Sequence, residues 1–239
     1  MRTKANLRTA YNARLQCLQG VISCFVLCLL TEAVIAQEFF QTCYQDQARQ
    51  HLRSEEIQSI VAADQADRQD FERLRTDQAY VQELLKRDLA RRKRIGEIFG
   101  EGCMKEARDF AAAALVYQHG DVPEHYFQTF LWAKRAVDLG DDSQKRLMAL
   151  GIDRYLVNIG HKQLFASQAS IPPGDKCWCL EQVEESFPEQ RRKEIAGMTL
   201  KEALEWVNSL NSNIPECQGP KQCVKPLAPS PLGTVPGYW

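Results

Sequence analysis

The sequence predicts an all-α protein: a bundle of short antiparallel helices with a disulfide-stapled helical C-terminal appendage. Apolar residues recur at helical spacings of three and four through the first two thirds of the chain. No stretch shows the sustained alternation of apolar and polar residues that is typical of a half-buried strand. Six cysteines follow the N-terminal leader, and an even number in an exported chain favours disulfides.

The first 36 residues predict a signal peptide. Basic residues precede the apolar run VISCFVLCLL, and Val34 and Ala36 match the small-residue pattern of a cleavage site. We expect cleavage after Ala36 and a mature chain that begins at Gln37. An uncleaved membrane anchor is the alternative, but the apolar run is about half the roughly 20 residues that a span needs. The protein is therefore expected in the periplasm or outside the cell, without stable membrane insertion after cleavage.

The mature chain divides by composition into a helical core domain (37–170), a cysteine-containing helical appendage (171–224) and a Pro- and Gly-rich tail (225–239). The full chain has 30 Lys+Arg and 31 Asp+Glu, of which the leader removes four basic residues and one acidic residue. The mature chain is thus slightly acidic, which gives no electrostatic reason to expect nucleic acid as a partner. We expect an unknown protein or small molecule as partner, and no cofactor.

Residues 45–99 are rich in charged residues and leucine, contain no proline, and predict two helices. The inward stripe of the first helix is expected to hold Ile57, Val61, Asp64, Arg68 and Phe71. Asp64 and Arg68 form an i, i+4 acid–base pair on this stripe. The second helix is expected to carry the apolar residues Leu84, Leu85, Leu89, Ile95 and Ile98 and to end at Gly100 or Gly102.

Residues 105–158 predict a series of short helices joined by tight turns. Four successive alanines allow the close approach of a neighbouring helix, and Gly120 ends this Ala-rich helix. Asp121 and Glu124 then predict a capping box that opens a helix over about 122–139. Its inward residues are expected to be Phe127, Phe130, Leu131, Ala133 and Val137. The next helix is expected to run to about Asn158 from a cap formed by Asp141, Asp142 or Ser143.

The appendage is expected to begin with a loop, because SIPPGDKCWC is rich in turn-forming residues. A short helix is expected over 180–195, broken near Pro188. Thr199 and Glu202 predict a second capping box, which opens a helix over 200–210. The tail after it is expected to be extended.

The cysteines outside the leader are Cys43, Cys103, Cys177, Cys179, Cys217 and Cys223. We expect Cys43 to pair with Cys103, because the two flank the first helical region. Cys177 and Cys179 are too close in sequence for an easy bond to each other, so each is expected to pair with one of the last two cysteines. The alternative is a four-thiolate zinc site from the last four cysteines. A one-residue gap fits zinc-ligand spacing poorly, and export favours oxidation.

Polar residues interrupt the expected core at helix ends and on inward stripes. They are Asp64, Gln65, Arg68, Gln118, His119, Asp153, Arg154, Gln163 and Gln168. Together with Gly160, their order and spacing over about residues 55–170 resemble an uncharacterised bacterial family of unknown function, DUF6624. The family's motifs are a DQ..R helix, a QH pair that closes an Ala-rich helix, a DR pair and a G..Q..(G/A)(T/S)Q ending. The resemblance implies that these residues belong together, and it implies no activity.

The chain departs from this family in two places. Phe165, Ala166 and Ser167 stand where members usually have Tyr-Gly-Thr. The Gly-Trp-Pro turn that the family has after the second helix is replaced by GEGC. The cysteine-bearing segment after 170 lies outside the resemblance.

A buried polar group costs several kcal/mol unless it is paired. We therefore expect these polar residues to meet in the interior, with Asp64 or Asp153 pairing with Arg68 or Arg154. Such a network need do no more than specify the fold. The alternative is a cleft in which His119 is a general base oriented by Asp153 and one of the two arginines holds an anionic group.

Three functions remain open. The leading hypothesis is an exported helical binding or interaction protein, because the sequence assembles no catalytic motif. The second is a hydrolase centred on His119, for which Ser167 is a nucleophile candidate by position alone. The third is a structural accessory protein of the cell envelope. No metal site is expected, because Pro123 keeps His119 and His125 off a shared helical face, and Glu124 is assigned to the capping box.

Overall fold

The computed structural model describes residues 42–219, 221–235 and 237. The predicted signal peptide lies outside the described residues. The chain divides into two compact units, residues 1–46 and 47–239, and the fold below is that of the second unit. This unit is mostly helical, which confirms the predicted fold class.

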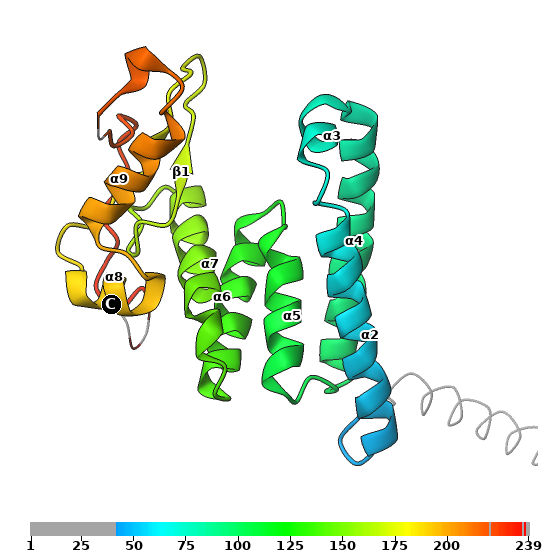
Figure 1. The fold of residues 1–239 in the computed structure, drawn as a ribbon. Helices are drawn as coiled ribbons and strands as arrows, with labels where there is room; N and C mark the ends of the chain where they lie inside the picture. Colours follow the sequence, from blue (N-terminus) through cyan, green and yellow to red (C-terminus); the bar gives the residue numbers. More distant parts are fainter. Residues whose placement is uncertain (1–41, 220, 236, 238–239) are drawn as a thin grey trace, which may run out of the picture. The chain divides into compact units, whose positions relative to one another are not determined.

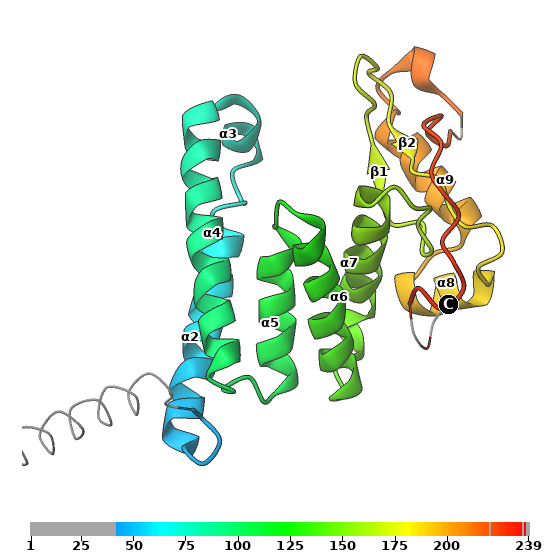
Figure 2. The same ribbon diagram turned by 180° about the vertical axis from the view of Figure 1, so that it is seen from behind.

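The long helices of the unit are α2 (Gln47–Ala66), α4 (Gln78–Gly100), α5 (Ala107–Gln118), α6 (Pro123–Asp138), α7 (Lys145–Asn158) and α9 (Leu200–Leu210). The shorter helical elements are α3 (Phe71–Thr76), α8 (Glu189–Ala196) and the 3₁₀ turns η1 (Asp142–Gln144) and η2 (Pro215–Cys217). Two short strands, β1 (Ala169–Ser170) and β2 (Cys179–Leu180), pair antiparallel. In Figures 1 and 2, α5, α6 and α7 lie side by side beyond the α2–α4 hairpin.

Ion pairs hold α2 against α4. The buried residues of α2 are Ser54, Ile57 and Asp64. On the rest of the interface, Arg94 Nε lies 2.6 Å from Glu56 Oε1, and Arg53 Nε lies 2.8 Å from Glu101 Oε2 just beyond the C-terminal end of α4. The hairpin thus depends on charge pairing where a typical helix pair would depend on apolar packing.

The predicted inward stripe is correct up to Arg68 and wrong at Phe71, whose exposed fraction is 78%. The physical reason is a turn: α2 ends at Ala66, and Phe71 begins a new helix capped by Asp70. On α4, Leu84, Ile95 and Ile98 are buried as expected, whereas Leu85 and Leu89 are exposed.

Close helix contacts build the central part of the unit. Ala112, Ala113 and Ala114 of α5 are buried, as the run of alanines predicts. Gly151 of α7 lies directly against α6, because a Cβ there would come within 2.8 Å of the backbone nitrogen of Phe130. Phe130 and Ala133 face inward on α6 as expected, whereas Leu131 is 40% exposed.

The predicted capping box at Asp121 is wrong. The N-cap of α6 is Val122, without a side-chain cap, and Pro123 occupies the first turn. The carboxylate of Asp121 points to two other groups: its Oδ1 lies 3.2 Å from Arg92 Nη2 and 3.1 Å from His125 Nδ1. The capping interaction that the local sequence predicts for Asp121 is therefore replaced by an ion pair with Arg92. Asp141 caps the 3₁₀ turn η1, which leads directly into α7, whereas α7 itself begins after Gln144 without a side-chain cap. The predicted end of this helix at Asn158 is confirmed.

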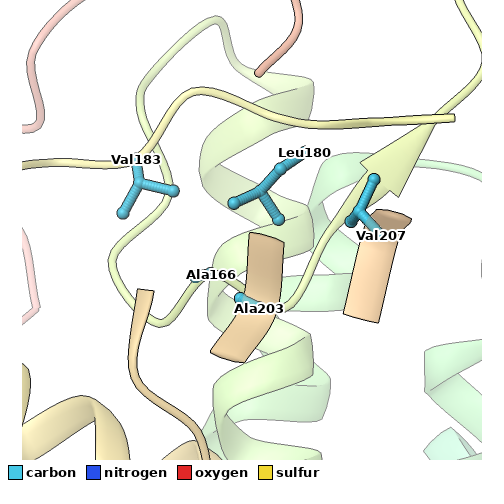
Figure 3. Packing of buried hydrophobic residues seen from close by; sticks show 5 residues of the cluster. All are labelled: Ala166, Leu180, Val183, Ala203 and Val207. Carbon is cyan, nitrogen blue, oxygen red and sulfur yellow. The ribbon is translucent and has the colours of Figure 1, made fainter. Parts of the chain in front are cut away.

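The appendage has its own small core. Figure 3 shows Ala166, Leu180, Val183, Ala203 and Val207 packed together, and all five are buried. The Thr199 capping box and the helix that it opens are confirmed.

The expected helix over 180–195 is wrong in its first half. That half contains β2 and an extended segment, in which the backbone of Gln182 and Glu184 pairs with Gln163. The regular helix α8 begins only after Pro188, whose missing N–H suits a helix start.

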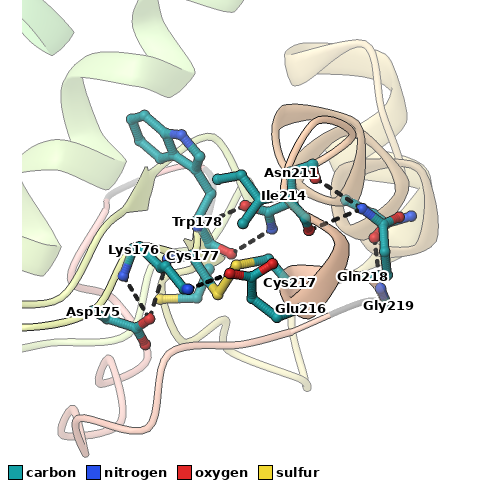
Figure 4. Close-up of a disulfide and its surroundings, with 12 residues drawn as sticks. Asp175, Lys176, Cys177, Trp178, Asn211, Ile214, Glu216, Cys217, Gln218 and Gly219 are labelled. Atoms are coloured by element: carbon teal, nitrogen blue, oxygen red, sulfur yellow. Dashed lines mark hydrogen bonds and ion pairs between the residues drawn. A yellow bond between two sulfur atoms is a disulfide. The ribbon is translucent and has the colours of Figure 1, made fainter.

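Disulfides form as predicted. Cys177 pairs with Cys217 and Cys179 pairs with Cys223, so these four sulfurs are not available as zinc thiolates. Cys43 and Cys103 are each disulfide-bonded as well. Figure 4 shows the first of these bridges beside Asn211, whose buried side chain accepts from the backbone N–H of Trp178 at 2.9 Å and donates to its carbonyl at 3.0 Å.

The tail packs against the helical core. The backbone N–H of Lys162 donates to Ala228 O at 2.9 Å, and the N–H of Ala228 donates to Gly160 O at 2.8 Å. The N–H of Ser230 donates to the Glu184 carboxylate at 3.1 Å. The expected extended tail therefore serves as an additional strand-like layer. Within the described part of the chain, no helix has the length and apolar character needed to cross a membrane.

We predict that Gly151→Ala destabilises the protein by about 1–3 kcal/mol, because the added methyl group overlaps the α6 backbone. Urea unfolding followed by circular dichroism measures the change in the free energy of unfolding. Gly100→Ala is the matched control, since a Cβ at this helical position meets no atom within 4 Å. Equal free energies of unfolding for the two variants would contradict the close α6–α7 contact.

Candidate functional site

The C-terminal end of α5 brings the predicted polar residues together. The last carbonyls of a helix have no partner within the helix, and this end carries partial negative charge. Two guanidinium groups donate hydrogen bonds to the carbonyls at this end. Arg92 Nη1 donates to His119 O at 3.1 Å, and Arg154 Nη1 donates to Gln118 O at 2.8 Å. Arg92 comes from α4 and Arg154 from α7, so three helices meet at the Gln118–His119 pair.

The imidazole of His119 is held by a buried carboxylate. His119 Nδ1 lies 2.9 Å from Asp64 Oδ2, and the Asp64 side chain is fully buried while the His119 side chain is 23% exposed. Asp64 also accepts from Arg68 Nη1 at 2.8 Å and from Gln65 Nε2 at 2.8 Å. Burial acts to raise the pKa of Asp64, but the His119 hydrogen bond and the nearby charges outweigh it, so the pKa lies below its usual value.

An ionised Asp64 fixes the proton of His119 on Nδ1 and leaves the Nε2 lone pair free, because the carboxylate can only accept. Nε2 takes part in no hydrogen bond with the described residues. The sequence pattern predicted that Asp153 orients the His119 ring. The structure assigns it to Asp64, which reaches the ring across the α2–α5 contact.

Further ion pairs link Asp64 through Arg68 to α4. Arg68 Nη2 lies 2.6 Å from Asp88 Oδ2, and Arg91 Nη1 lies 3.1 Å from Asp88 Oδ1. Arg91 also contacts Asp67. The sequence pattern did not identify Asp88 and Arg91 as site residues, although their i, i+3 spacing on α4 was a usable signal. The Arg91 side chain is only 12% exposed.

The buried carboxylate of Asp153 stabilises a turn of the backbone. Its fully buried carboxylate accepts from the backbone N–H of Leu164 at 2.8 Å and Phe165 at 3.0 Å, and from the N–H and hydroxyl of Ser167. Burial raises the pKa of Asp153, and these donors act against that rise. They hold the turn in which Ala166 adopts a positive φ of 59°. Ser167 is thus committed to this turn, which leaves it poorly placed as a nucleophile.

Gln163 and Gln168 connect this turn to Arg154 and to the appendage. Arg154 Nε donates to Gln168 Oε1 at 3.2 Å. Gln163 Nε2 donates to Gln168 O at 3.0 Å and to Glu181 O at 2.8 Å, while Gln163 Oε1 accepts from Gln168 N. The expected single network is therefore two clusters, one around Asp64 and one around Asp153 and the glutamines. Among the described residues, the two clusters are linked through Gln118 and His119 at the end of α5.

Two polar atoms at this meeting point have no partner. Arg92 Nε and Gln118 Oε1 are buried and form no hydrogen bond within the described residues. The Gln118 residue is 6% exposed. Buried polar atoms are normally satisfied, so these two atoms are exceptions at this end of α5.

The histidines are not assembled into a metal site. The His119 ring faces Asp64, whereas the His125 ring is bonded to Asp121 and packs edge-on against Tyr117 at a centroid distance of 5.6 Å. Desolvation and the charge of Arg92 lower the pKa of His125. The two rings therefore serve separate contacts.

An open cavity of about 600 Å³ lies at the α3–α4 end of the hairpin, and Asp67, Arg73, Asp77, Tyr80, Glu83 and Arg87 line it. Its charged groups already pair with one another: Arg73 with Asp77 at 3.2 Å and Arg87 with Asp67 at 2.9 Å. The cavity does not include His119. We therefore place the candidate site at the C-terminal end of α5.

Comparison of the chain with protein-family models, with curated proteins and with solved structures finds no match. The chemistry of the site consequently has to be argued from its own geometry.

We predict that Asp153→Ala costs on the order of 3 kcal/mol in the free energy of unfolding, because it leaves the buried N–H groups of the 164–167 turn without an acceptor. Chemical denaturation measures the loss. Asp138→Ala removes an exposed i, i+4 ion pair with Lys134 and is expected to cost less than about 0.5 kcal/mol. Similar costs for both variants would contradict the role of Asp153.

Asp64 should also contribute to acid sensitivity. Its lowered pKa means that the unfolded chain binds a proton more readily, so the stability it contributes is complete above the ordinary value of 3.8 and is lost as the pH falls below it. Asp64→Asn should therefore reduce the slope of unfolding free energy against pH between about pH 4 and pH 2.5. An unchanged slope would contradict the ion pairing.

Proposed function

We propose that this chain is an exported helical binding protein whose ligand contacts His119 at the C-terminal end of α5. One observation supports the proposal most directly: the Nδ1 atom of His119 is fixed by a buried carboxylate 2.9 Å away, while the ring is 23% exposed and its Nε2 is unengaged. A ring held in one tautomer and one orientation loses little freedom when it binds a ligand, which favours recognition.

A purely structural role accounts less well for the imidazole. The backbone carbonyls at this end of α5 are already served by Arg92 and Arg154. Asp64 is already paired with Arg68. The His119 side chain is thus not needed to satisfy either group, and the buried, unpaired amide oxygen of Gln118 lies one residue away. A structural accessory protein of the cell envelope is the other alternative, and for such a protein we expect no small ligand to bind here.

Export is part of the proposal. The leader at the N-terminus of the sequence has the pattern of a signal peptide. Disulfides form and persist in oxidising compartments such as the periplasm and the extracellular space, and the described cysteines are disulfide-bonded.

A hydrolase is the second candidate, and the Asp64–His119 pair favours it. A carboxylate on Nδ1 and a free Nε2 is the arrangement of a general base. Because Ser167 is engaged with Asp153, water is the nucleophile in this reaction. Nε2 of His119 would take a proton from the water as its oxygen attacks the ester or phosphoryl centre, and the imidazolium would return the proton to the leaving oxygen. Asp64 would stabilise that imidazolium.

Nuclear magnetic resonance tests the proposed site directly. Uniformly labelled protein is titrated with a panel of small sugars, amino acids, dipeptides, nucleotides and carboxylates, and the ring carbon–proton signals of the histidines are followed. We expect at least one compound to shift the His119 signals and to raise the melting temperature. His119→Gln should abolish both effects, and His51→Gln, which alters an exposed histidine of α2, should leave them unchanged.

Two results would count against binding at His119. One is a panel in which no compound moves the His119 signals. The other is a ligand that binds equally well to the His119→Gln protein. The hydrolase is tested separately with a panel of carboxylic and phosphate esters, on which His119→Gln should lower the rate by about 100-fold or more. The same residual rate in wild type and variant would reject it.

A further inference from the structure

Arg154 differs from Arg68, Arg91 and Arg92, the other buried or partly buried arginines around this site, in having no acidic partner among the described residues. Arg68 lies 2.8 Å from Asp64, Arg91 lies 3.1 Å from Asp88, and Arg92 lies 3.2 Å from Asp121. No carboxylate oxygen of the described residues lies within 4.0 Å of the Arg154 guanidinium. We infer that Arg154 binds an oxyanion, a carboxylate or phosphate group carried by the ligand. This inference rests on the proposed function and names the chemical class of the ligand.

The groups that contact Arg154 are neutral. Its Nη1 donates to the carbonyl of Gln118 at 2.8 Å, and its Nε donates to the amide oxygen of Gln168 at 3.2 Å. Its guanidinium carbon lies 5.3 Å from the centroid of the Tyr126 ring. Arginine stays ionised in proteins, so these contacts leave a full positive charge without a counterion.

The end of α5 offsets only part of this charge. A helix C-terminus carries about half a negative elementary charge. Here it is shared by two guanidinium groups, and the one carboxylate paired with either of them is Asp121, whose side chain is 63% exposed. The surroundings of Arg92 and Arg154 therefore keep a net positive charge. Desolvation accordingly lowers the pKa of Arg154, which is the direction expected for a cation that lacks a compensating anion.

The unpaired donor atoms of Arg154 indicate the shape of the group that would bind it. Arg154 Nη2 donates no hydrogen bond to the described residues. Together with the second hydrogen of Nη1, it forms the end of a planar fork that matches two oxygens of a carboxylate or phosphate. At the same end of α5, the amide oxygen of Gln118 and the Nε of Arg92 are buried and unpaired. A ligand with an oxyanion would pair with the free fork of Arg154, which capping of α5 alone does not.

The structure distinguishes Arg154 from Arg68, which the sequence could not do. Arg68 and Arg154 were equal candidates for holding an anionic group. Both carboxylates near Arg68 already occupy its Nη1 and Nη2 atoms, at 2.8 Å and 2.6 Å. An incoming anion would meet two negative charges there, whereas at Arg154 it meets none. The geometry therefore assigns the oxyanion to Arg154.

The test uses the mature full-length protein with its disulfides intact, and acetate and inorganic phosphate as probes. The guanidinium Nε–Hε signal of Arg154 is followed by nuclear magnetic resonance, with sodium chloride holding the ionic strength constant. We expect a saturable shift of this signal with one or both probes, and the preferred probe distinguishes carboxylate from phosphate ligands. Because the Arg154 variants lack this signal, the affinities of wild type and variants are compared through the backbone N–H signal of His119, which follows the Gln118 carbonyl that Arg154 contacts. Arg154→Gln should weaken binding by about 10- to 100-fold, since a charge-assisted fork is lost.

Arg146→Gln is the matched control. Arg146 lies on the same helix, is exposed and has no carboxylate within 4.0 Å, so this variant removes an equal charge without touching the site. Its affinity should stay within about twofold of wild type, as expected for an exposed charge. Arg154→Lys provides a second variant that keeps the charge and loses the fork. Should either Arg154 variant fail to fold, the saturable shift in the wild-type protein still decides the question.

An unsaturable response of Arg154 to both probes would overturn the inference. So would an equal loss of affinity in Arg146→Gln and Arg154→Gln, because it would show general charge attraction. If neutral compounds shift His119 while neither probe affects Arg154, the inference fails and the proposed binding function stands. If the probes shift Arg154 while no compound affects His119, the oxyanion site stands and the proposed role of His119 fails.

Discussion

Side chains cap both ends of α5, and helices α2, α4 and α7 contribute to these caps. At the N-terminal end, the Asp109 carboxylate accepts from the backbone N–H of Lys105 and Glu106, each at 3.1 Å, and from the buried hydroxyl of Ser54 on α2. At the C-terminal end, Arg92 and Arg154 reach in from α4 and α7. A short helix capped in this way constrains the positions of α2, α4 and α7 together. An unpaired buried carbonyl or N–H costs more free energy than most single contacts contribute.

This constraint explains why charge collects at one point of the fold. Guanidinium groups are long and carry several donors, so they reach a buried carbonyl from a neighbouring helix without breaking that helix. The positive charge that they bring must then be balanced. Arg92 is balanced by Asp121 and Arg68 by Asp64 and Asp88, while Arg154 has no acidic partner among the described residues. The side chains that cap α5 are thus the same ones that we propose for ligand recognition.

Local signals in the sequence predicted the parts of the fold that depend on local contacts. The Thr199 capping box formed although Lys193 Nζ lies 2.7 Å from Glu202 Oε1, because the other carboxylate oxygen of Glu202 still accepts from Thr199 N. The box at Asp121 did not form, because Arg92, far away in sequence, supplies a stronger partner. Helical spacing placed Asp64 and Arg68 correctly, but it could not show that the chain turns before Phe71. Likewise, the carboxylate that orients His119 depends on which helices pack together, and neither Asp64 nor Asp153 is marked for that role by sequence spacing.

The ionic α2–α4 hairpin gives the protein one end whose cohesion depends on its surroundings. Its interhelix pairs, such as Arg94 with Glu56 and Arg53 with Glu101, are partly open to water, where dissolved ions screen charges over about 8 Å at physiological salt. The apolar contacts between α6 and α7 do not weaken in this way. The Asp64 carboxylate on α2 is fully buried beside His119, so salt should weaken these outer pairs before it weakens the orientation of the imidazole.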